Sequence, residues 1–403
     1  MRLNSSFFNK IGKMLDFYSQ FNPSPLSIKQ FLDFGMNKCE SKSYVFLKKE
    51  LPVRLANIMK EIALLPDNLL RTPSVGLLSN WYARSFEEVI EFEKTDPTSD
   101  NLKRFCMILS HIRDRHADVV QTMAQGIMEL KDSQNIEPGM ETSIQYFLDR
   151  FYMSRISIRM LINQHTLLFG EGSEHAKHIG CIEIDCDPKI VVKDAYENAR
   201  WLCDQYYYGA PEIVVKEHNE LERGEPINIV YVPSHLYHIL FEIFKNAMRA
   251  VMETHQERGD IPPIQVIIVK GKEDICVKVS DQGGGIPRSS ADQLFKYMYS
   301  TAPHPSKSDV HTVPLAGFGY GLPISRLYAR YFHGDISLMS CDGYGTDAII
   351  YMKRLSDEAN ELLPIFNKTS SRFYNKSTVS AGDWSNQSSL DMLNQWKLIR
   401  EGN

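Results

Sequence analysis

The 403-residue sequence lacks several features that define common protein classes. It contains no run of about 18 apolar residues, so we expect no membrane-spanning helix. It has no block rich in Lys or Arg, and its net charge of -5 at pH 7 argues against nucleic acid as a partner. The seven cysteines are scattered without CxxC spacing, which indicates neither a disulfide framework nor a zinc site and favours a reducing compartment.

The apolar content is 43%, which at this length is enough to bury a sizeable core and predicts two domains with a tail. The opening segment, residues 1–24, carries Arg2, Lys10 and Lys13 and has no acidic residue before Asp16. It resembles the remnant of a mitochondrial transit segment, so we treat it as separate from the folded domains.

Residues 25–177 are expected to form a helical domain. Four segments within it place apolar residues three and four positions apart, with helix-breaking residues between the segments. These segments are residues 50–66, 77–94, 101–132 and 141–169. Four antiparallel helices of this kind predict a four-helix bundle.

The pattern changes over residues 178–364. Short β-branched runs such as INIVYV, IQVIIVKG and ICVKVSD alternate with helical stretches, which predicts an α/β sandwich with a mixed sheet. Residues 365–403 are rich in Ser and Asn, and we expect an extended tail that needs a partner surface to become ordered. The predicted fold class is therefore α+β, with a helical bundle followed by an α/β sandwich.

The segment PSHLYHILFEIFKNAMRAVMETH predicts one amphipathic helix. Its apolar arc consists of Leu236, Ile239, Leu240, Ile243, Phe244, Ala247 and Val251. The opposite side carries His238, Glu242, Lys245, Asn246 and Arg249, and three of these, at four-residue steps, form a column. A solvated helix face is one interpretation. The other is a catalytic site, because one helix face carries a carboxylate, a histidine that can modulate the carboxylate and an amide oxygen that can bind magnesium.

A glycine-rich stretch, SDQGGGIP, follows a predicted strand that ends at Asp281. A carboxylate beside a backbone without side chains can accept the amino group of a flat ring that lies on the glycines. The alternative is a common glycine-rich turn opened by an aspartate.

A second stretch, GFGYGLP, packs Gly317, Gly319 and Gly321 into the start of a helix. Bare backbone amides at the positive end of a helix dipole attract anions, so a phosphate site is one interpretation. A purely structural turn is the other.

The order of these features resembles the Bergerat, or GHKL, ATP-binding fold of type II topoisomerases, MutL and histidine kinases. The sequence has no Walker-type GxxxxGK[ST], and GFGYG does not follow a strand within a βαβ unit. The longer strings LFEIFKNAMRA, SDQGGGIP, YMYSTAP and GFGYGLPISRLYARYF are similar to those of mitochondrial pyruvate dehydrogenase kinases, over roughly residues 25–385.

This resemblance implies an ATP-dependent protein serine kinase of the mitochondrial matrix. It would act as a homodimer and would phosphorylate, and so inactivate, the E1α subunit of the pyruvate dehydrogenase complex. Two alternatives stay open: a kinase of the branched-chain α-ketoacid dehydrogenase complex, and a scaffold that binds ATP and a lipoyl domain without transferring phosphate. A phosphohistidine relay is not expected, because Asn68 stands where histidine kinases carry their acceptor histidine.

The resemblance also implies roles for individual residues. Asn246 would coordinate Mg²⁺, Asp281 would hold the adenine amino group with Thr346 nearby, and Glu242 would be the general base, modulated by a hydrogen bond from His238. The ATP-binding residues would be Glu242, Lys245, Asn246, Arg249, Asp281, Gly283, Gly285, Ser300, Thr301, Leu315, Gly317, Phe318, Gly319, Tyr320, Gly321 and Thr346. For Lys245 and Arg249, a salt bridge on the helix surface is the alternative.

Regulation and docking are implied for the helical domain and the tail. A pocket for a pyruvate-like effector would be formed by Tyr82, Ser85, Arg113, His116, Arg155 and Arg159. Arginines on inward helix faces suit a small carboxylate, and buried ion pairs with Asp114, Asp118 or Asp149 are the alternative. Phe34 and Phe46 would line the slot for a lipoyl group of the acetyltransferase core, or would be ordinary core residues. Asp383 and Trp384 would anchor the tail on a second subunit.

Overall fold

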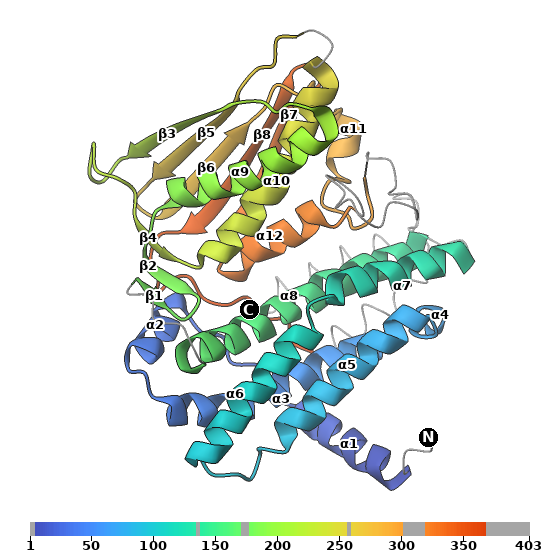
Figure 1. The fold of residues 1–403 in the computed structure, drawn as a ribbon. Helices are drawn as coiled ribbons and strands as arrows, with labels where there is room; N and C mark the ends of the chain where they lie inside the picture. Colours follow the sequence, from blue (N-terminus) through green and yellow to red (C-terminus); the bar gives the residue numbers. More distant parts are fainter. Residues whose placement is uncertain (1–4, 134–137, 171–176, 256–258, 301–318, 368–403) are drawn as a thin grey trace, which may run out of the picture.

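The computed structural model describes residues 5–133, 138–170, 177–255, 259–300 and 319–367. Its N-terminal part is helical and its C-terminal part combines helices with a sheet, so the predicted α+β class is confirmed (Figure 1). In the described part of the chain, no helix combines the length and apolarity needed to cross a bilayer.

The N-terminal part is built from helices that pack side by side around one core. They are α1 (Ser5–Tyr18), α2 (Ile28–Met36), α3 (Glu40–Ile62), α4 (Asp67–Leu70), α5 (Pro73–Ile90), α6 (Ser99–Arg115), α7 (Val119–Ser133) and α8 (Pro138–Phe169). Local signals set several of the starts: Ser27 and Gln30 form a capping box at α2, Thr98 caps α6, and Pro73 opens α5.

The predicted third helix, residues 101–132, is two helices. The chain leaves the helix at His116, whose backbone N–H still bonds the carbonyl of Ile112, and it resumes helix at Val119. The break lets the buried His116 side chain reach Ser85 on α5, with 3.0 Å between Nε2 and Oγ. The amphipathic period alone does not reveal a break of this kind, because both halves keep their apolar residues on the core side.

The C-terminal part contains a five-stranded sheet in the order β3-β5-β6-β8-β7, and a smaller sheet in the order β1-β2-β4. Its elements are β1 (His178–Ile179), β2 (Ile182–Cys186), α9 (Pro188–Tyr207), β3 (Ile213–Asn219), β4 (Ile229–Tyr231), α10 (Pro233–His255), β5 (Ile264–Lys270), β6 (Asp274–Ser280), α11 (Arg288–Ala291), α12 (Gly321–Tyr331), β7 (Asp335–Cys341) and β8 (Gly345–Lys353). β3 pairs with β5 in parallel and the other pairs of the larger sheet are antiparallel, so the sheet is mixed, as predicted.

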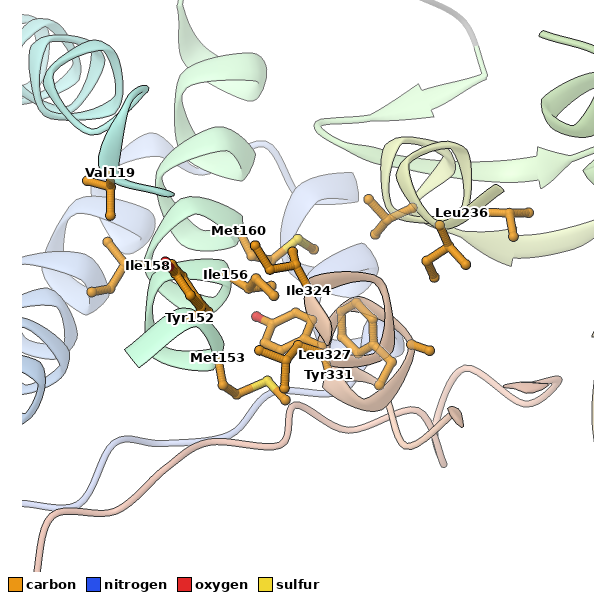
Figure 2. Packing of buried hydrophobic residues seen from close by; sticks show 14 of the residues in the cluster. Val119, Tyr152, Met153, Ile156, Ile158, Met160, Leu236, Ile324, Leu327 and Tyr331 are labelled. Carbon is orange, nitrogen blue, oxygen red and sulfur yellow. The ribbon is translucent and has the colours of Figure 1, made fainter. Parts of the chain in front are cut away.

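Helices α9 and α10 cover one face of the larger sheet, and α12 lies between that layer and α8 of the helical part (Figure 1). Ile324, Leu327 and Tyr331 of α12 point toward Met153 and Met160 of α8, and all of them are buried (Figure 2). The two parts of the chain therefore share one apolar core.

A buried ionic network joins the segment after β8 to the helical part. The Arg54 guanidinium on α3 donates to both carboxylate oxygens of Glu361, at 2.7 and 2.8 Å, and to Glu50 at 2.9 Å. The Tyr331 hydroxyl bonds the same Glu361 carboxylate. The side chains of Arg54 and Glu361 are only 2% and 0% exposed, so solvent cannot replace either partner.

We therefore expect Arg54→Ala to be strongly destabilising. It leaves two buried carboxylates without their cation, which costs about 3–5 kcal/mol of unfolding free energy, measurable by urea denaturation. The matched control is Arg288→Ala, which removes an ion pair with Asp292 whose side chains are 82% and 84% exposed. This control should cost under about 0.5 kcal/mol. Equal losses in the two variants would contradict the prediction.

Candidate functional site

Helix α10 has the bounds and the two faces that the sequence predicts. Every residue of the predicted apolar arc is buried. The polar side is not a solvated face: the side chains of Glu242 and Lys245 are only 18% and 12% exposed, and their carboxylate and ammonium groups are 2.7 Å apart. Partly buried charges on one helix face, close to two glycine-rich turns, are typical of a functional site.

Glu242 faces the first residue of α12. A Cβ added at Gly321 would overlap the Oε2 atom of Glu242, so only glycine leaves room for the carboxylate there. The carboxylate therefore lies against the N-terminus of α12, where the free backbone amides favour negative charge. Gly321, which is predicted to bind phosphates through its backbone, thus also makes room for the predicted base, Glu242.

His238 lies one helical turn before Glu242, but no hydrogen bond between the two is present in the described structure. The ring of His238 packs on Tyr328 of α12, with centroids 4.7 Å apart, and its buried Nε2 atom has no partner among the described residues. Burial lowers the pKa of His238, although the charge of Glu242 acts in the opposite direction. The predicted hydrogen bond is thus replaced by the ion pair between Glu242 and Lys245.

The other predicted residues of α10 differ in their contacts. Arg249 donates to Glu253 at 2.8 Å, so it makes the helix-surface pair that was the alternative to a phosphate contact. The half-buried side chain of Asn246 makes no hydrogen bond to another described residue, which leaves its amide oxygen available to a ligand. The described residues contain no group of three or more His, Cys, Asp or Glu side chains placed to hold a metal.

Asp281 follows β6 and is held beside Thr346 of β8. Their backbones exchange hydrogen bonds of 3.0 and 3.3 Å, and the Asp281 carboxylate accepts from the N–H groups of Gly283 and Thr346. Burial raises the pKa of the Asp281 carboxyl, and the two backbone hydrogen bonds act against that rise. The structure thus brings Asp281 and Thr346 together in a half-buried position.

Two glycines after Asp281 permit close backbone approach. A Cβ at Gly283 would overlap Ala250 of α10, and one at Gly285, whose φ is +71°, would overlap the carbonyl of Cys341. The loop after β6 is therefore pressed against the helix that carries Glu242 and Asn246, which places the two predicted motifs side by side.

The remaining predicted ATP-binding residues lie around the segment 301–318. Ser300, Gly319 and Tyr320 are described: Tyr320 is buried, and the backbone of Gly319 touches that of Tyr299. Four predicted residues lie outside the described residues, namely Thr301, Leu315, Gly317 and Phe318. The predicted tail anchor, Asp383 and Trp384, also lies outside them.

Most of the predicted effector residues meet where the C-terminal end of α6 packs against the middle of α5 and α8. His116 bonds Ser85, its ring lies 4.5 Å from that of Tyr82, and the Arg155 guanidinium donates to the His116 carbonyl at 3.2 Å. Burial lowers the pKa of His116 to about 4, and the charge of Arg155 acts in the same direction. The Tyr82 hydroxyl and the Arg155 Nε atom are buried without a partner among the described residues.

One member of the predicted set, Arg113, has a different partner in this structure, and its role in the pocket stays a prediction. The Arg113 side chain is 35% exposed and pairs with Asp114, while Arg115 donates to Ser85 at 2.9 Å and pairs with Glu88 at 2.8 Å. Periodicity does not separate the two arginines, because Arg113 lies four residues after the buried Leu109 and Arg115 three residues after the buried Ile112.

Arg155 and Arg159 form no ion pair with Asp114, Asp118 or Asp149 in the part of the chain that the structure describes. Arg159 reaches the carbonyl of Arg113 at 3.4 Å, and burial lowers its pKa, with the charge of Arg155 adding to the effect. The alternative of buried ion pairs is therefore wrong. Two neighbouring arginine side chains without a carboxylate partner can bind a small anion.

Phe34 and Phe46 line one cavity of about 200 Å³ between α2, α3 and α8. Phe31, Leu161 and Leu168 line it as well, so its walls are mainly apolar. Both predicted phenylalanines are half-buried, so part of each ring remains accessible to a ligand in the cavity.

Comparison with known families matches two stretches of the chain. Residues 25–183 match the family described as mitochondrial branched-chain alpha-ketoacid dehydrogenase kinase. Residues 231–356 match the family described as histidine kinase-, DNA gyrase B-, and HSP90-like ATPase, which confirms the predicted GHKL class.

Curated relatives match over nearly the whole chain. The mitochondrial [pyruvate dehydrogenase (acetyl-transferring)] kinase of Drosophila melanogaster is 69% identical over 391 residues, covering 95% of this chain and 94% of the relative. Isozyme 3 of Homo sapiens is 57% identical over 384 residues, covering 94% of each chain. Isozyme 1 of Rattus norvegicus is 58% identical over 374 residues, covering 92% of this chain and 86% of the relative.

The raised pKa of Asp281 yields a test that separates stability from binding. At a pH above the folded-state pKa, the buried charge lowers the free energy of unfolding, so Asp281→Asn should stabilise the ligand-free protein. The gain should disappear as the pH falls below about 4, where the carboxyl is protonated in both the folded and unfolded states. The same variant should bind ADP about tenfold more weakly or worse, as measured by calorimetry.

Asp347→Asn is the matched control. Burial raises the pKa of Asp347, but hydrogen bonds from Ser280 and Lys278 outweigh this effect and leave it lowered. The control should therefore lose stability at neutral pH and keep its affinity for ADP. If Asp281→Asn lost stability at neutral pH and bound ADP normally, the assignment of Asp281 would fail.

Proposed function

Because the chain belongs to the mitochondrial pyruvate dehydrogenase kinase family, we propose that it is an ATP-dependent protein serine kinase. Its substrate is the E1α subunit of the pyruvate dehydrogenase complex, which phosphorylation inactivates. The family match of residues 231–356 and the 57–69% identity of relatives named as pyruvate dehydrogenase kinases support this activity.

One observation carries the catalytic part of the proposal: the Glu242 carboxylate lies against Gly321, at the N-terminus of α12. The same helix start offers backbone amides to phosphate oxygens. A carboxylate beside a phosphate site is placed to take the proton of an attacking serine hydroxyl. Phosphoryl transfer requires mainly positioning of the reacting groups and neutralisation of charge, and this arrangement can provide both.

The residues around Glu242 have separate tasks in this mechanism. Glu242 accepts the serine proton, and the Lys245 ammonium, 2.7 Å from the carboxylate, holds it in place and offers a positive charge to a phosphate oxygen. His238, which is buried and packs on Tyr328 one turn before the base, is proposed to modulate it. Asp281 accepts the amino group of the adenine ring, beside the loop that Gly283 holds against α10.

The donor set suits a magnesium ion that is bound through the nucleotide. The Asn246 amide oxygen lies on the same helix face as Glu242 and makes no hydrogen bond to another described residue. Mg²⁺ is commonly held by one or two protein oxygens together with substrate phosphates, where it neutralises phosphate charge. Asn246 would be the protein ligand.

A second substrate class is tested alongside the first, because residues 25–183 match a family described as the branched-chain kinase. The pyruvate complex is favoured, since whole-chain relatives at 57–69% identity carry the pyruvate name. A scaffold that binds ATP and a lipoyl domain without transfer is disfavoured by the position of Glu242.

We assign residues 25–177 to regulation and docking and residues 178–364 to the ATP-binding kinase domain. The cluster of Tyr82, Ser85, Arg113, His116, Arg155 and Arg159 is proposed to bind a pyruvate-like carboxylate, with Arg115, which donates to Ser85, as a further member. Its unpartnered Tyr82 hydroxyl and Arg155 Nε atom, and its excess of positive charge, support this role.

The cavity lined by Phe34 and Phe46 is proposed to take the lipoyl group of the acetyltransferase core. Its volume of about 200 Å³ and mainly apolar walls suit an aliphatic chain with a small ring. The protein would work in the mitochondrial matrix, where its substrate complex would meet it.

A homodimer is proposed through the face of the larger sheet that α9 and α10 leave uncovered (Figure 1). The strand register places Ile267, Lys278 and Ile349 in one row on that face, and all three are partly exposed. Residues 365–403, with Asp383 and Trp384, would then reach the second subunit as a tail.

Glu242→Gln tests the catalytic proposal. The amide cannot accept the serine proton, so transfer from labelled ATP to purified E1 should fall at least about 100-fold, while the Kd for ADP stays within about twofold. Glu197→Gln, an exposed change on α9, is the control and should leave both quantities unchanged. Running pyruvate and branched-chain E1 in parallel decides the substrate. Undiminished transfer by Glu242→Gln would eliminate this residue as the base.

Arg115→Met and Arg155→Met test the anion cluster. Each removes a charged hydrogen-bond donor, so the Kd for dichloroacetate should rise about tenfold or more, as measured by calorimetry. Arg84→Met is the matched control: it removes the same charge from a side chain that is 70% exposed and pairs with Glu88, and it should leave the Kd unchanged. An unchanged Kd in both Arg115→Met and Arg155→Met would overturn the proposal, and a comparison with Arg113→Met decides which arginines of α6 line the pocket.

A further inference from the structure

Helix α8 of the helical part forms hydrogen bonds to the backbone of one residue of the kinase part, Tyr297. The Gln145 side chain accepts a hydrogen bond from the Tyr297 N–H at 2.8 Å and donates one to the Tyr297 carbonyl at 3.2 Å. One amide thus satisfies both backbone groups of a residue 152 positions away, as a neighbouring strand would. The contact fixes the backbone at this point and not merely a side chain.

The Tyr297 side chain is held by the same helix. Its hydroxyl donates to Asp149 at 2.9 Å, one turn after Gln145, and its ring lies 5.6 Å from that of Tyr152. On the other side it lies 5.4 Å from the ring of Tyr320, which sits between the two glycines that open α12. Tyr297 is only 3% exposed, so these contacts take nearly all of its surface.

The next residue is strained. Met298 has a φ of +66°, in the left-handed region that a long side chain rarely adopts. Its N–H donates to the Gly319 carbonyl at 3.1 Å, and a Cβ at Gly319 would overlap the backbone of Tyr299. A conformation of this kind persists only where its surroundings enforce it, and here the anchors are Gln145 before it and Gly319 after it.

The strained turn leads directly to the nucleotide site proposed above. Gly321 lies two positions after Gly319, and its missing side chain leaves room for the Glu242 carboxylate. Ser300, a predicted ATP-binding residue, follows two positions after Met298. Release of the turn would free the backbone of Gly319 and so the start of α12.

We propose that Gln145 is a positioning residue for the nucleotide site: by clamping the backbone of Tyr297, it holds the left-handed turn at Met298 and hence the glycine start of α12 in register with Glu242. The helical part thus supplies part of the frame of the ATP site without touching nucleotide. This inference rests on the proposed ATP site, and the experiment distinguishes a failure of one from a failure of the other.

The experiment compares the full-length chain with Gln145→Ala, Met298→Gly and the double variant. Gln145→Ala loses both hydrogen bonds to Tyr297, so the Kd for ADP and the KM for ATP should rise about tenfold. Glycine adopts the left-handed conformation without steric strain, so Met298→Gly added to Gln145→Ala should recover a large part of that loss. A merely structural role for Gln145 predicts no such rescue, because Met298→Gly restores no contact to α8.

Glu141→Ala is the matched control. It is an exposed position one turn before Gln145 on α8, and its Kd for ADP should equal that of the wild type. If Gln145→Ala does not fold, Gln145→Glu replaces it: it keeps the acceptor for the Tyr297 N–H but loses the donor to the carbonyl, and a several-fold rise in Kd is expected. Failure of the wild type to bind ADP would overturn the proposed function. Normal binding of ADP by the Gln145 variant, or additive effects without rescue, would overturn this inference alone.

Discussion

The packing of α12 between α8 and α10 is the contact on which the arrangement of the site depends. Ile324, Leu327 and Tyr331 of this short helix are buried against α8 (Figure 2). Its first residue, Gly321, lies against Glu242, and its last, Tyr331, bonds the buried carboxylate of Glu361. Because protein cores are close-packed, a shift of α12 on α8 would move both ends together, so the helical part sets the geometry of the glycine turn.

The described residues include two kinds of buried or half-buried arginine, and the difference between them separates structure from ligand binding. Arg54 is enclosed by Glu50 and Glu361, so its charge is fully paired and its role is to hold the end of the described chain in place. Arg155 and Arg159 have carbonyl oxygens as partners but no carboxylate within the described residues. A buried charge without a counter-ion is costly, and a small anion would offset that cost.

How far the sequence alone could predict the site depends on the kind of information each residue needed. The faces of α10 follow from a period of 3.6 residues, so the burial of Leu236 and the shared face of Glu242 and Asn246 were predictable. The contact of Arg115 with Ser85 was not predictable, because it depends on how α6 packs on α5. The missing hydrogen bond of His238 was not predictable, because Tyr328 and Lys245, which decide the partners of His238 and Glu242, come from the packing of α12 and from a competing ion pair.

The sequence by itself determined the α+β class, the order of the glycine-rich motifs and the family, because these depend on local periodicity and on strings of residues that can be read in one dimension. Only the tertiary structure decided that Gly321 makes room for Glu242, that Gln145 clamps Tyr297, and that two arginines remain without carboxylates. Each of these is a contact between segments far apart in the chain. Such contacts are set by how whole helices pack, and no local pattern of residues records which side chain will meet which backbone.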